Sequence, residues 1–142
     1  MRSSRRGAHA VEFAIIFPIW LAIVIAIMEF GWLFFNVALL DAAADIGCRA
    51  GSLIDPGNAD ERIALVEART TSRMRDVLVT FGAGECATCE VRAETVGAPP
   101  SRTLLCEVSR EVDPLTTLMF GTRTLRSVQV SRLEWQREAA PE

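Results

Sequence analysis

The sequence predicts an α+β protein in which a long N-terminal transmembrane helix continues into a small head. The head is expected to hold a second helix and a three-stranded antiparallel sheet. One supporting observation is an apolar run over residues 13–35 that contains a single charge, Glu29. As a helix this run would be about 35 Å long, enough to cross a hydrocarbon core of roughly 30 Å. Two further observations are apolar residues at helical spacing after the run and segments towards the C-terminus in which apolar and polar residues alternate.

The charges on either side of the apolar run indicate an orientation. Arg2, Arg5 and Arg6 precede the run without an accompanying acid, whereas acidic residues outnumber arginines from Asp41 onward. Positive charge marks the cytoplasmic side of a membrane span, so the head is expected outside the cytoplasm. A mildly acidic head also disfavours nucleic-acid binding, which requires a basic surface to neutralise phosphates.

The apolar run fits a retained anchor better than a removable signal peptide. It exceeds the 7–15 residues that are typical of a signal's apolar region, and a small-residue cleavage site at residues 42–44 lies well beyond it. Glu12 and Glu29 are also unusual in a signal, since a carboxylate within the bilayer costs about 2.5–3.5 kcal/mol. For Glu29, a boundary carboxylate that reaches water is favoured over a contact with a cation of a partner subunit.

The segment from Arg5 to Phe13 carries the most informative motif. A short basic leader ends at Gly7, and Glu12 follows five residues later, directly before Phe13 and the apolar run. This arrangement resembles the class III signal of type IV pilins and pseudopilins. The resemblance implies that a prepilin peptidase cuts between Gly7 and Ala8. Glu12 would then neutralise the amino terminus of a neighbouring subunit during assembly.

The resemblance extends along the rest of the first helix. Glu12-Phe13-Ala14, Pro18, Glu29-Phe30-Gly31 and residues 42–51 are similar to the TadE-like family, minor pseudopilins of the tight-adherence (Flp, type IVc) pilus machinery. The resemblance implies a type IV pilin-like fold. It divides the chain into a leader that is removed (1–7), a transmembrane part of the helix (8–40) and an extracytoplasmic head (41–142).

The resemblance also implies partners and a location. The partners would be the prepilin peptidase, other pilins and pseudopilins, the inner-membrane pilus assembly platform, and the lipid bilayer itself. The chain would be a single-pass protein of the bacterial inner membrane, with a cytoplasmic N-terminus and a periplasmic or extracellular head. Whether it enters the pilus fibre is left open.

Beyond the membrane the helix is expected to continue as an amphipathic segment with a kink near Pro18. Its predicted apolar stripe is Leu39, Ala42, Ile46, Ala50 and Leu53. A separate row of small residues, Ala43, Gly47 and Gly51, permits close helix approach. This row either seats the helix against its own head or packs against a partner.

The head follows a turn at residues 55–57. A cap at Asn58 predicts a second helix that runs to about Phe81, with a buried stripe made of Ile63, Val66, Thr70, Met74, Val77 and Phe81. Strands are predicted for Cys89–Val96, Thr103–Val112 and Thr124–Trp135, the last with a bulge between Val130 and Leu133. The connection over 114–121 carries Leu115, Leu118, Met119 and Phe120 and is expected to pack into the core rather than to contact a partner.

The four cysteines predict up to two disulfides, because the head is expected in an oxidising compartment. Cys89 and Cys106 lie on adjacent predicted strands and are the first predicted pair, which leaves Cys48 for Cys86. A zinc site is disfavoured, since Cys86-x-x-Cys89 lacks a second close pair and the single histidine, His9, lies near the leader. A thioredoxin-like site is disfavoured because the motif opens a strand.

No catalytic constellation is recognisable, so the chain is expected to be a structural subunit without cofactor or metal rather than an enzyme. The head has no histidine that could act as a base, no glycine-rich phosphate loop and no G-x-S-x-G motif. Two alternatives remain. One is a secreted disulfide-containing binding module whose apolar segment is a removed signal, and the other is a single-pass anchored protein unrelated to pili.

Overall fold

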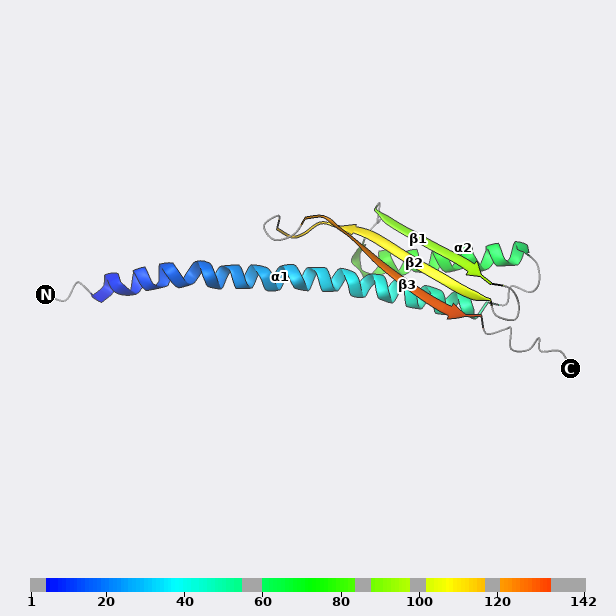
Figure 1. Cartoon of the computed structure of the whole chain (residues 1–142), viewed down its shortest axis with the longest axis horizontal. Coiled ribbons are helices and arrows are strands. Elements are labelled where there is room, and N and C mark those ends of the chain that lie inside the picture. Colours follow the sequence, from blue (N-terminus) through cyan, green and yellow to red (C-terminus); the bar gives the residue numbers. More distant parts are fainter. Residues whose placement is uncertain (1–4, 55–59, 84–87, 98–101, 117–120, 134–142) are drawn as a thin grey trace.

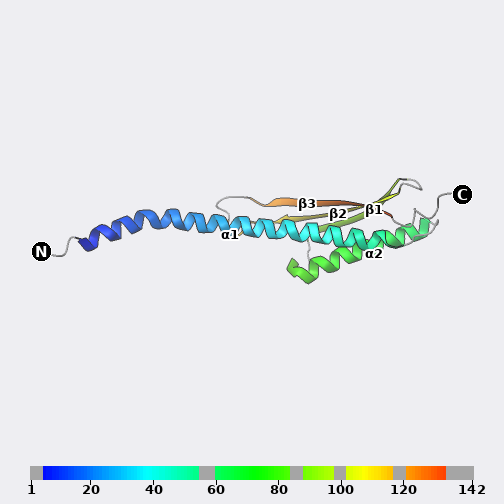
Figure 2. The same ribbon diagram turned by 90° about the horizontal axis from the view of Figure 1, so that it is seen from below.

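The computed structural model describes residues 5–54, 60–83, 88–97, 102–116 and 121–133. It contains helix α1 (Arg5–Ser52), helix α2 (Asp60–Leu78) with a short π-helical extension η1 (Val79–Ala83), and strands β1 (Cys89–Val96), β2 (Thr103–Val112) and β3 (Arg123–Arg132). The sheet forms one layer and the two helices form the other (Figure 2). This arrangement confirms the predicted α+β fold.

Helix α1 is a single element of 48 residues that is continuous through Pro18. Its N-terminal part projects away from the head and curves gently, and its C-terminal part lies beneath the sheet (Figure 1). In place of the predicted kink near Pro18, the helix follows a gentle curve (Figure 1). Ala and Ile are the commonest residues of the helix, and the missing N–H of one proline does not interrupt it.

The sheet is antiparallel in the order β1-β2-β3. On β2 the buried side chains alternate, with Leu104, Cys106 and Val108 facing the helices. The predicted bulge in β3 is wrong, because its pairing with β2 is continuous from Arg123 to Arg132. The alternation of apolar residues breaks after Val130 because β3 ends at Arg132. The buried Leu133 lies just beyond the strand and does not follow its alternation.

The core lies between the C-terminal half of α1, helix α2 and the inner face of the sheet. The predicted stripe on α1 is wrong in part, since Ile46 is 39% exposed and Leu53 is 67% exposed. The small side chains on the adjacent face let α2 and β2 approach closely, so that face is buried instead. The buried core residues are Leu39, Leu40, Ala43, Ala44, Cys48, Val66, Met74, Val77, Leu78, Leu104, Cys106, Val108 and Leu133.

Helix α2 buries most of its predicted stripe, including Val66, Thr70, Met74 and Val77. The prediction is wrong for Phe81, which is 58% exposed. Phe81 lies in η1, and the wider π-helical turn shifts the phase of the helix after Leu78. The predicted cap at Asn58 lies outside the described residues.

The connection between β2 and β3 does not enter the core where it is described. Leu115 is 52% exposed, so the expectation that it would pack inside is wrong. Residues 113–116 lie beside α1 at Glu29 and Trp32, whereas the core residues of α1 begin at Leu39, so there is no interior at this level for Leu115 to fill. Leu118, Met119 and Phe120 lie outside the described residues.

Candidate functional site

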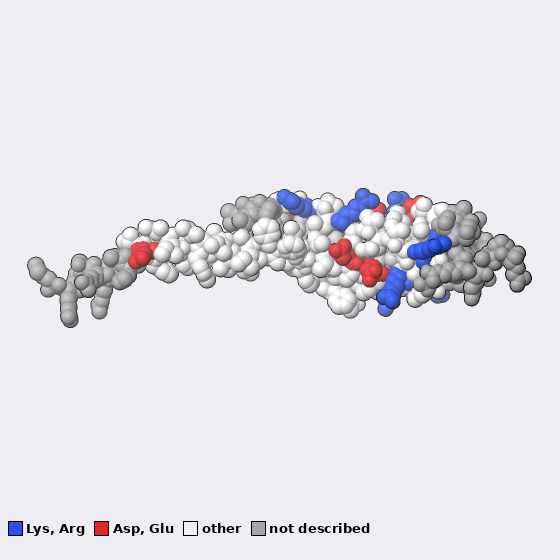
Figure 3. Space-filling view, turned by 60° about the horizontal axis from the view of Figure 1, so that its bottom comes forward, with Lys and Arg blue, Asp and Glu red and all other residues white. Residues whose placement is uncertain are grey.

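Beyond Glu12, the N-terminal half of α1 presents an uninterrupted apolar surface. Every side chain from Ala10 to Ile23 is exposed. From Phe13 to Trp32 the helix rises about 28 Å, close to the thickness of a bilayer's hydrocarbon core. Figure 3 shows this stretch free of charge between an acidic residue near its N-terminal end and the charged head. By length and composition α1 is able to cross a membrane, and it fits a single-pass anchor.

The predicted cleavage motif lies at the start of this surface. Gly7 and Ala8 belong to α1, but their surroundings lie outside the described part of the chain. Glu12 is exposed, and Phe13 beside it is 65% exposed. The rings of Phe13 and Phe17 lie 5.4 Å apart. Together with Ile16 and Trp20 they line a shallow apolar groove on α1, a surface suited to contact with another apolar helix.

A carboxylate is buried where α1 first meets the head. Glu29 is only 3% exposed, contrary to the expectation that it reaches water. One oxygen of its carboxylate accepts hydrogen bonds from the backbone N–H of Thr116 at 3.1 Å and from the Thr116 hydroxyl at 2.8 Å. The connection after β2 therefore supplies the partners that a buried carboxylate requires.

Two further polar contacts follow along the same face of α1. The indole Nε1 of Trp32 donates a hydrogen bond to the carbonyl oxygen of Asp113 at 3.3 Å. The buried Asn36 accepts one from the Arg110 guanidinium at 3.2 Å. We call Glu29, Trp32 and Asn36 the polar seam. Their spacing of three and four residues places them on one helix face. Their partners Arg110, Asp113 and Thr116 are three residues apart, at the end of β2 and just after it.

The row of small residues lies within the chain's own head. Ala43 is fully buried, and a Cβ added to Gly47 would overlap the side chain of Met74. A Cβ added to Gly51 would overlap the Thr70 hydroxyl and the Leu104 side chain. The structure thus places the row against α2 and β2. Because glycine has no side chain, α1 can approach both elements closely.

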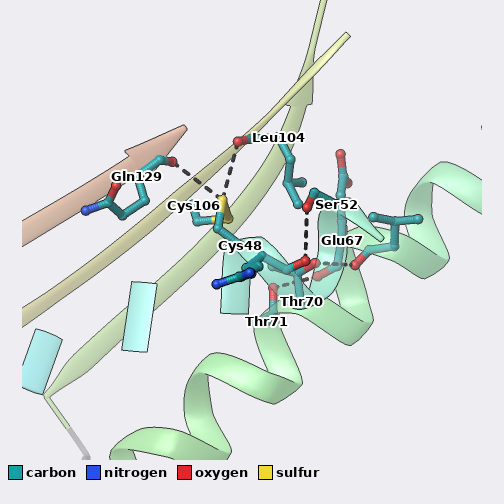
Figure 4. Close-up of a disulfide and its surroundings, with 10 residues drawn as sticks. Cys48, Ser52, Glu67, Thr70, Thr71, Leu104, Cys106 and Gln129 are labelled. Atoms are coloured by element: carbon teal, nitrogen blue, oxygen red, sulfur yellow. Dashed lines mark hydrogen bonds between the residues drawn. A yellow bond between two sulfur atoms is a disulfide. The ribbon is translucent and has the colours of Figure 1, made fainter. Parts of the chain in front are cut away.

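A disulfide joins Cys48 on α1 to Cys106 on the central strand, with 5.7 Å between their Cα atoms (Figure 4). The Cys48 sulfur lies 3.4 Å from the carbonyl oxygen of Leu104 and 3.6 Å from that of Gln129. A disulfide sulfur has no hydrogen to donate, so these are close packing contacts. They show that the bond lies under the middle of the sheet.

The predicted pairs Cys89–Cys106 and Cys48–Cys86 are therefore wrong. The register places Cys89 opposite Arg110, whereas Ala93 lies opposite Cys106. Cys89 and Cys106 are thus four residues out of register, about 13 Å along the strand. Cys89 is itself disulfide-bonded, and Cys86 lies outside the described residues.

The polar seam escaped the sequence analysis except for Glu29. Asn36 was the residue that could have revealed it. An amide side chain directly after an apolar run is unfavourable to bury unless it is hydrogen-bonded, so Asn36 indicates a polar contact. Its spacing from Glu29 and Trp32 identifies a shared face. Among the described residues no group of three or more His, Cys, Asp and Glu is arranged to hold a metal ion.

These features fit a single-pass, membrane-anchored class of protein, with a small α+β head joined to the anchor helix by a polar seam and a disulfide. The comparison with protein families is more specific. Residues 7–49 match the model of the TadE-like protein family, so this N-terminal segment is similar to that family, which confirms the predicted resemblance. No curated protein and no solved structure matches the chain significantly.

The family match covers nearly all of helix α1. It begins at the glycine of the predicted cleavage motif and ends one residue beyond Cys48. It thus includes the exposed apolar surface, the polar seam and the first two residues of the small-residue row. The match indicates a subunit related to the tight-adherence pilus, with an N-terminal membrane-spanning helix.

Proposed function

We propose that this chain is a minor pseudopilin of the tight-adherence system, made as a precursor that a prepilin peptidase cleaves between Gly7 and Ala8. The observation that carries the proposal is the position of Gly7, Glu12 and Phe13 at the start of the exposed apolar helix, inside the segment that matches the TadE-like family. The product would begin at Ala8 and keep the whole anchor.

Glu12 has a specific task in this proposal. Cleavage leaves a positively charged amino group at Ala8, in a region where neighbouring subunits would pack through apolar helices. A carboxylate near that level neutralises the charge of an adjacent subunit and aligns the two helices. Glu12 is exposed on α1 beside the apolar groove, where an incoming helix would meet it.

The head is joined to the anchor helix at two places, which supports a role in which a partner bound to the head moves the helix. Its sheet is joined to α1 by the Cys48–Cys106 disulfide and, at its other end, by Glu29 and Thr116. A partner that binds the head would therefore displace the helix with it. We propose that the chain uses this rigid connection to help initiate or regulate pilus assembly at the inner membrane, with its N-terminus in the cytoplasm.

The burial pattern argues against removal of the helix as a secretory signal. Leu39, Leu40, Ala43 and Ala44 belong to the core, with at most 6% of each side chain exposed. A signal peptidase cut near residues 42–44 would separate most of these side chains from the head. Losing one such large side chain typically costs 2–5 kcal/mol, so the cut product would be unstable.

The test is mass spectrometry of the N-terminal peptide from cells with and without a prepilin peptidase. A terminus at Ala8 that depends on the peptidase, and that disappears in Gly7→Ala, is the expected result. Glu12→Gln is expected to keep this terminus but to lose pilus assembly. An uncut chain in peptidase-competent cells, or a terminus within residues 42–46, would refute the proposal.

A further inference from the structure

The hairpin tip (Asp113–Thr116) is held at a defined height along α1. Thr116 contacts the Glu29 carboxylate through both its N–H and its hydroxyl, and the carbonyl of Asp113 accepts a hydrogen bond from Trp32. Three hydrogen bonds to two positions on one helix face fix the height of the tip relative to the helix. Its depth in a membrane therefore follows from the depth of Glu29.

The apolar run sets the depth of Glu29. Glu12 and the arginines before it belong outside the hydrocarbon core, so the core begins near Phe13. About 20 helical residues cross a 30 Å core, which places the outer boundary near Trp32. Glu29 lies three residues before this boundary, about 4.5 Å inside it. The hairpin tip reaches the same level.

The surface at this level has the composition of a membrane interface. Leu115 at the tip is 52% exposed, and the aromatic side chains of α1 around this height are exposed as well. Apolar surface also continues between helix and tip, since Leu33, Val112 and Pro114 line a hollow there. The exposed aromatics are Phe30, Trp32, Phe34 and Phe35. Tryptophan is enriched where hydrocarbon meets headgroups, and phenylalanine side chains are favourable in the adjoining hydrocarbon.

The burial of Glu29 is consistent with this environment. A carboxylate that faced lipid at this depth would be unfavourable by a few kcal/mol. The tip covers the carboxylate with Thr116 and leaves the apolar side chain of Leu115 on the outside. At Thr116 the polar atoms thus face inwards and at Leu115 the apolar side chain faces outwards. The Asp113 carboxylate stays exposed and accepts a hydrogen bond from the Thr122 hydroxyl, as the headgroup side of the boundary allows.

We infer that the hairpin tip inserts into the outer interfacial layer of the bilayer that α1 spans, with Leu115 in contact with lipid. The partner is phospholipid, at the boundary between acyl chains and headgroups. This inference rests on the proposed membrane anchor. The head would then be attached to the membrane at two points, α1 and the tip, and would stand in one orientation to the surface.

The test places an environment-sensitive fluorophore (NBD) on an azide-bearing amino acid at position 115 of the full chain, so that the native cysteines stay intact. The protein is reconstituted into phosphatidylethanolamine–phosphatidylglycerol vesicles containing lipids with a nitroxide quencher near the headgroup. Two matched positions serve as controls. Ile19 is 61% exposed on the apolar helix, and Val130 is 61% exposed on β3, about 23 Å along the strand from Arg123.

The expected result is strong quenching with a blue-shifted emission at 115 and at 19, several-fold greater than at 130. Quenching at 19 with none at 115 would overturn the inference and leave the membrane anchor intact. Absence of quenching at both positions would overturn the anchor and the inference together. Equal quenching at 115 and 130 would also overturn it, because the contact would not be specific to the tip.

Discussion

The Cys48–Cys106 disulfide is expected to supply a large part of the stability of the head. It spans 58 residues, from the anchor helix to the central strand. In the chain-entropy model, a loop of this length raises the free energy of unfolding by about 4 kcal/mol at 25 °C. A small domain has about 5–15 kcal/mol in total, so the reduced head should be close to unfolding.

The assay uses Cys86→Ala/Cys89→Ala, a variant in which only this disulfide remains. Urea unfolding of the head, followed by pulse proteolysis in detergent micelles, is compared between its oxidised and reduced forms. Reduction leaves both buried sulfur atoms in place, so no cavity forms and the difference reports the crosslink itself. A loss below about 1 kcal/mol, with thiol titration showing full reduction, would refute the reasoning, because the unfolded chain would then gain little freedom.

Two further predictions concern the contacts between α1 and the head. Gly51→Ala should destabilise the head by about 1–3 kcal/mol in the same assay, because the new methyl group would overlap Thr70 and Leu104. Gly31→Ala is the matched control and should cause no loss, since nothing lies within 4 Å of its added Cβ; equal effects would contradict the packing argument. Thr116→Val should cost about 1.5–3 kcal/mol, because it removes a hydrogen bond to a buried carboxylate. Faster hydrogen exchange in residues 113–116 would report this loss. Thr122→Val, whose hydroxyl contacts the exposed Asp113 carboxylate, should have a smaller effect, and the reverse order would be inconsistent with a polar seam.

The long anchor helix and the strands could be predicted from the sequence because their signals are local. The apolar run, Glu12 and Gly7 lie within one continuous segment, and the family match falls on the same residues. On β2 the alternation of Leu104, Cys106 and Val108 repeats every second residue, which is the period of a strand. Such patterns do not depend on what packs against them.

The predictions that failed required information about distant contacts. Alternation places Cys106 on the inner face but does not indicate which cysteine lies below it, and this depends on the rotation and height of α1 under the sheet. Ile46 and Leu53 are more hydrophobic than Gly47 and Gly51, yet the glycine face is buried because only it allows close approach of α2 and β2.

The sequence by itself determined that this chain has an apolar helix with a pilin-like processing motif and a small α+β head. Only the tertiary structure decided that the head reaches down the helix to Glu29 and encloses its carboxylate with Thr116. The two residues are 87 positions apart, and no local periodicity joins them. Their contact depends on how far the β2–β3 hairpin extends past the core, which is a property of the assembled fold.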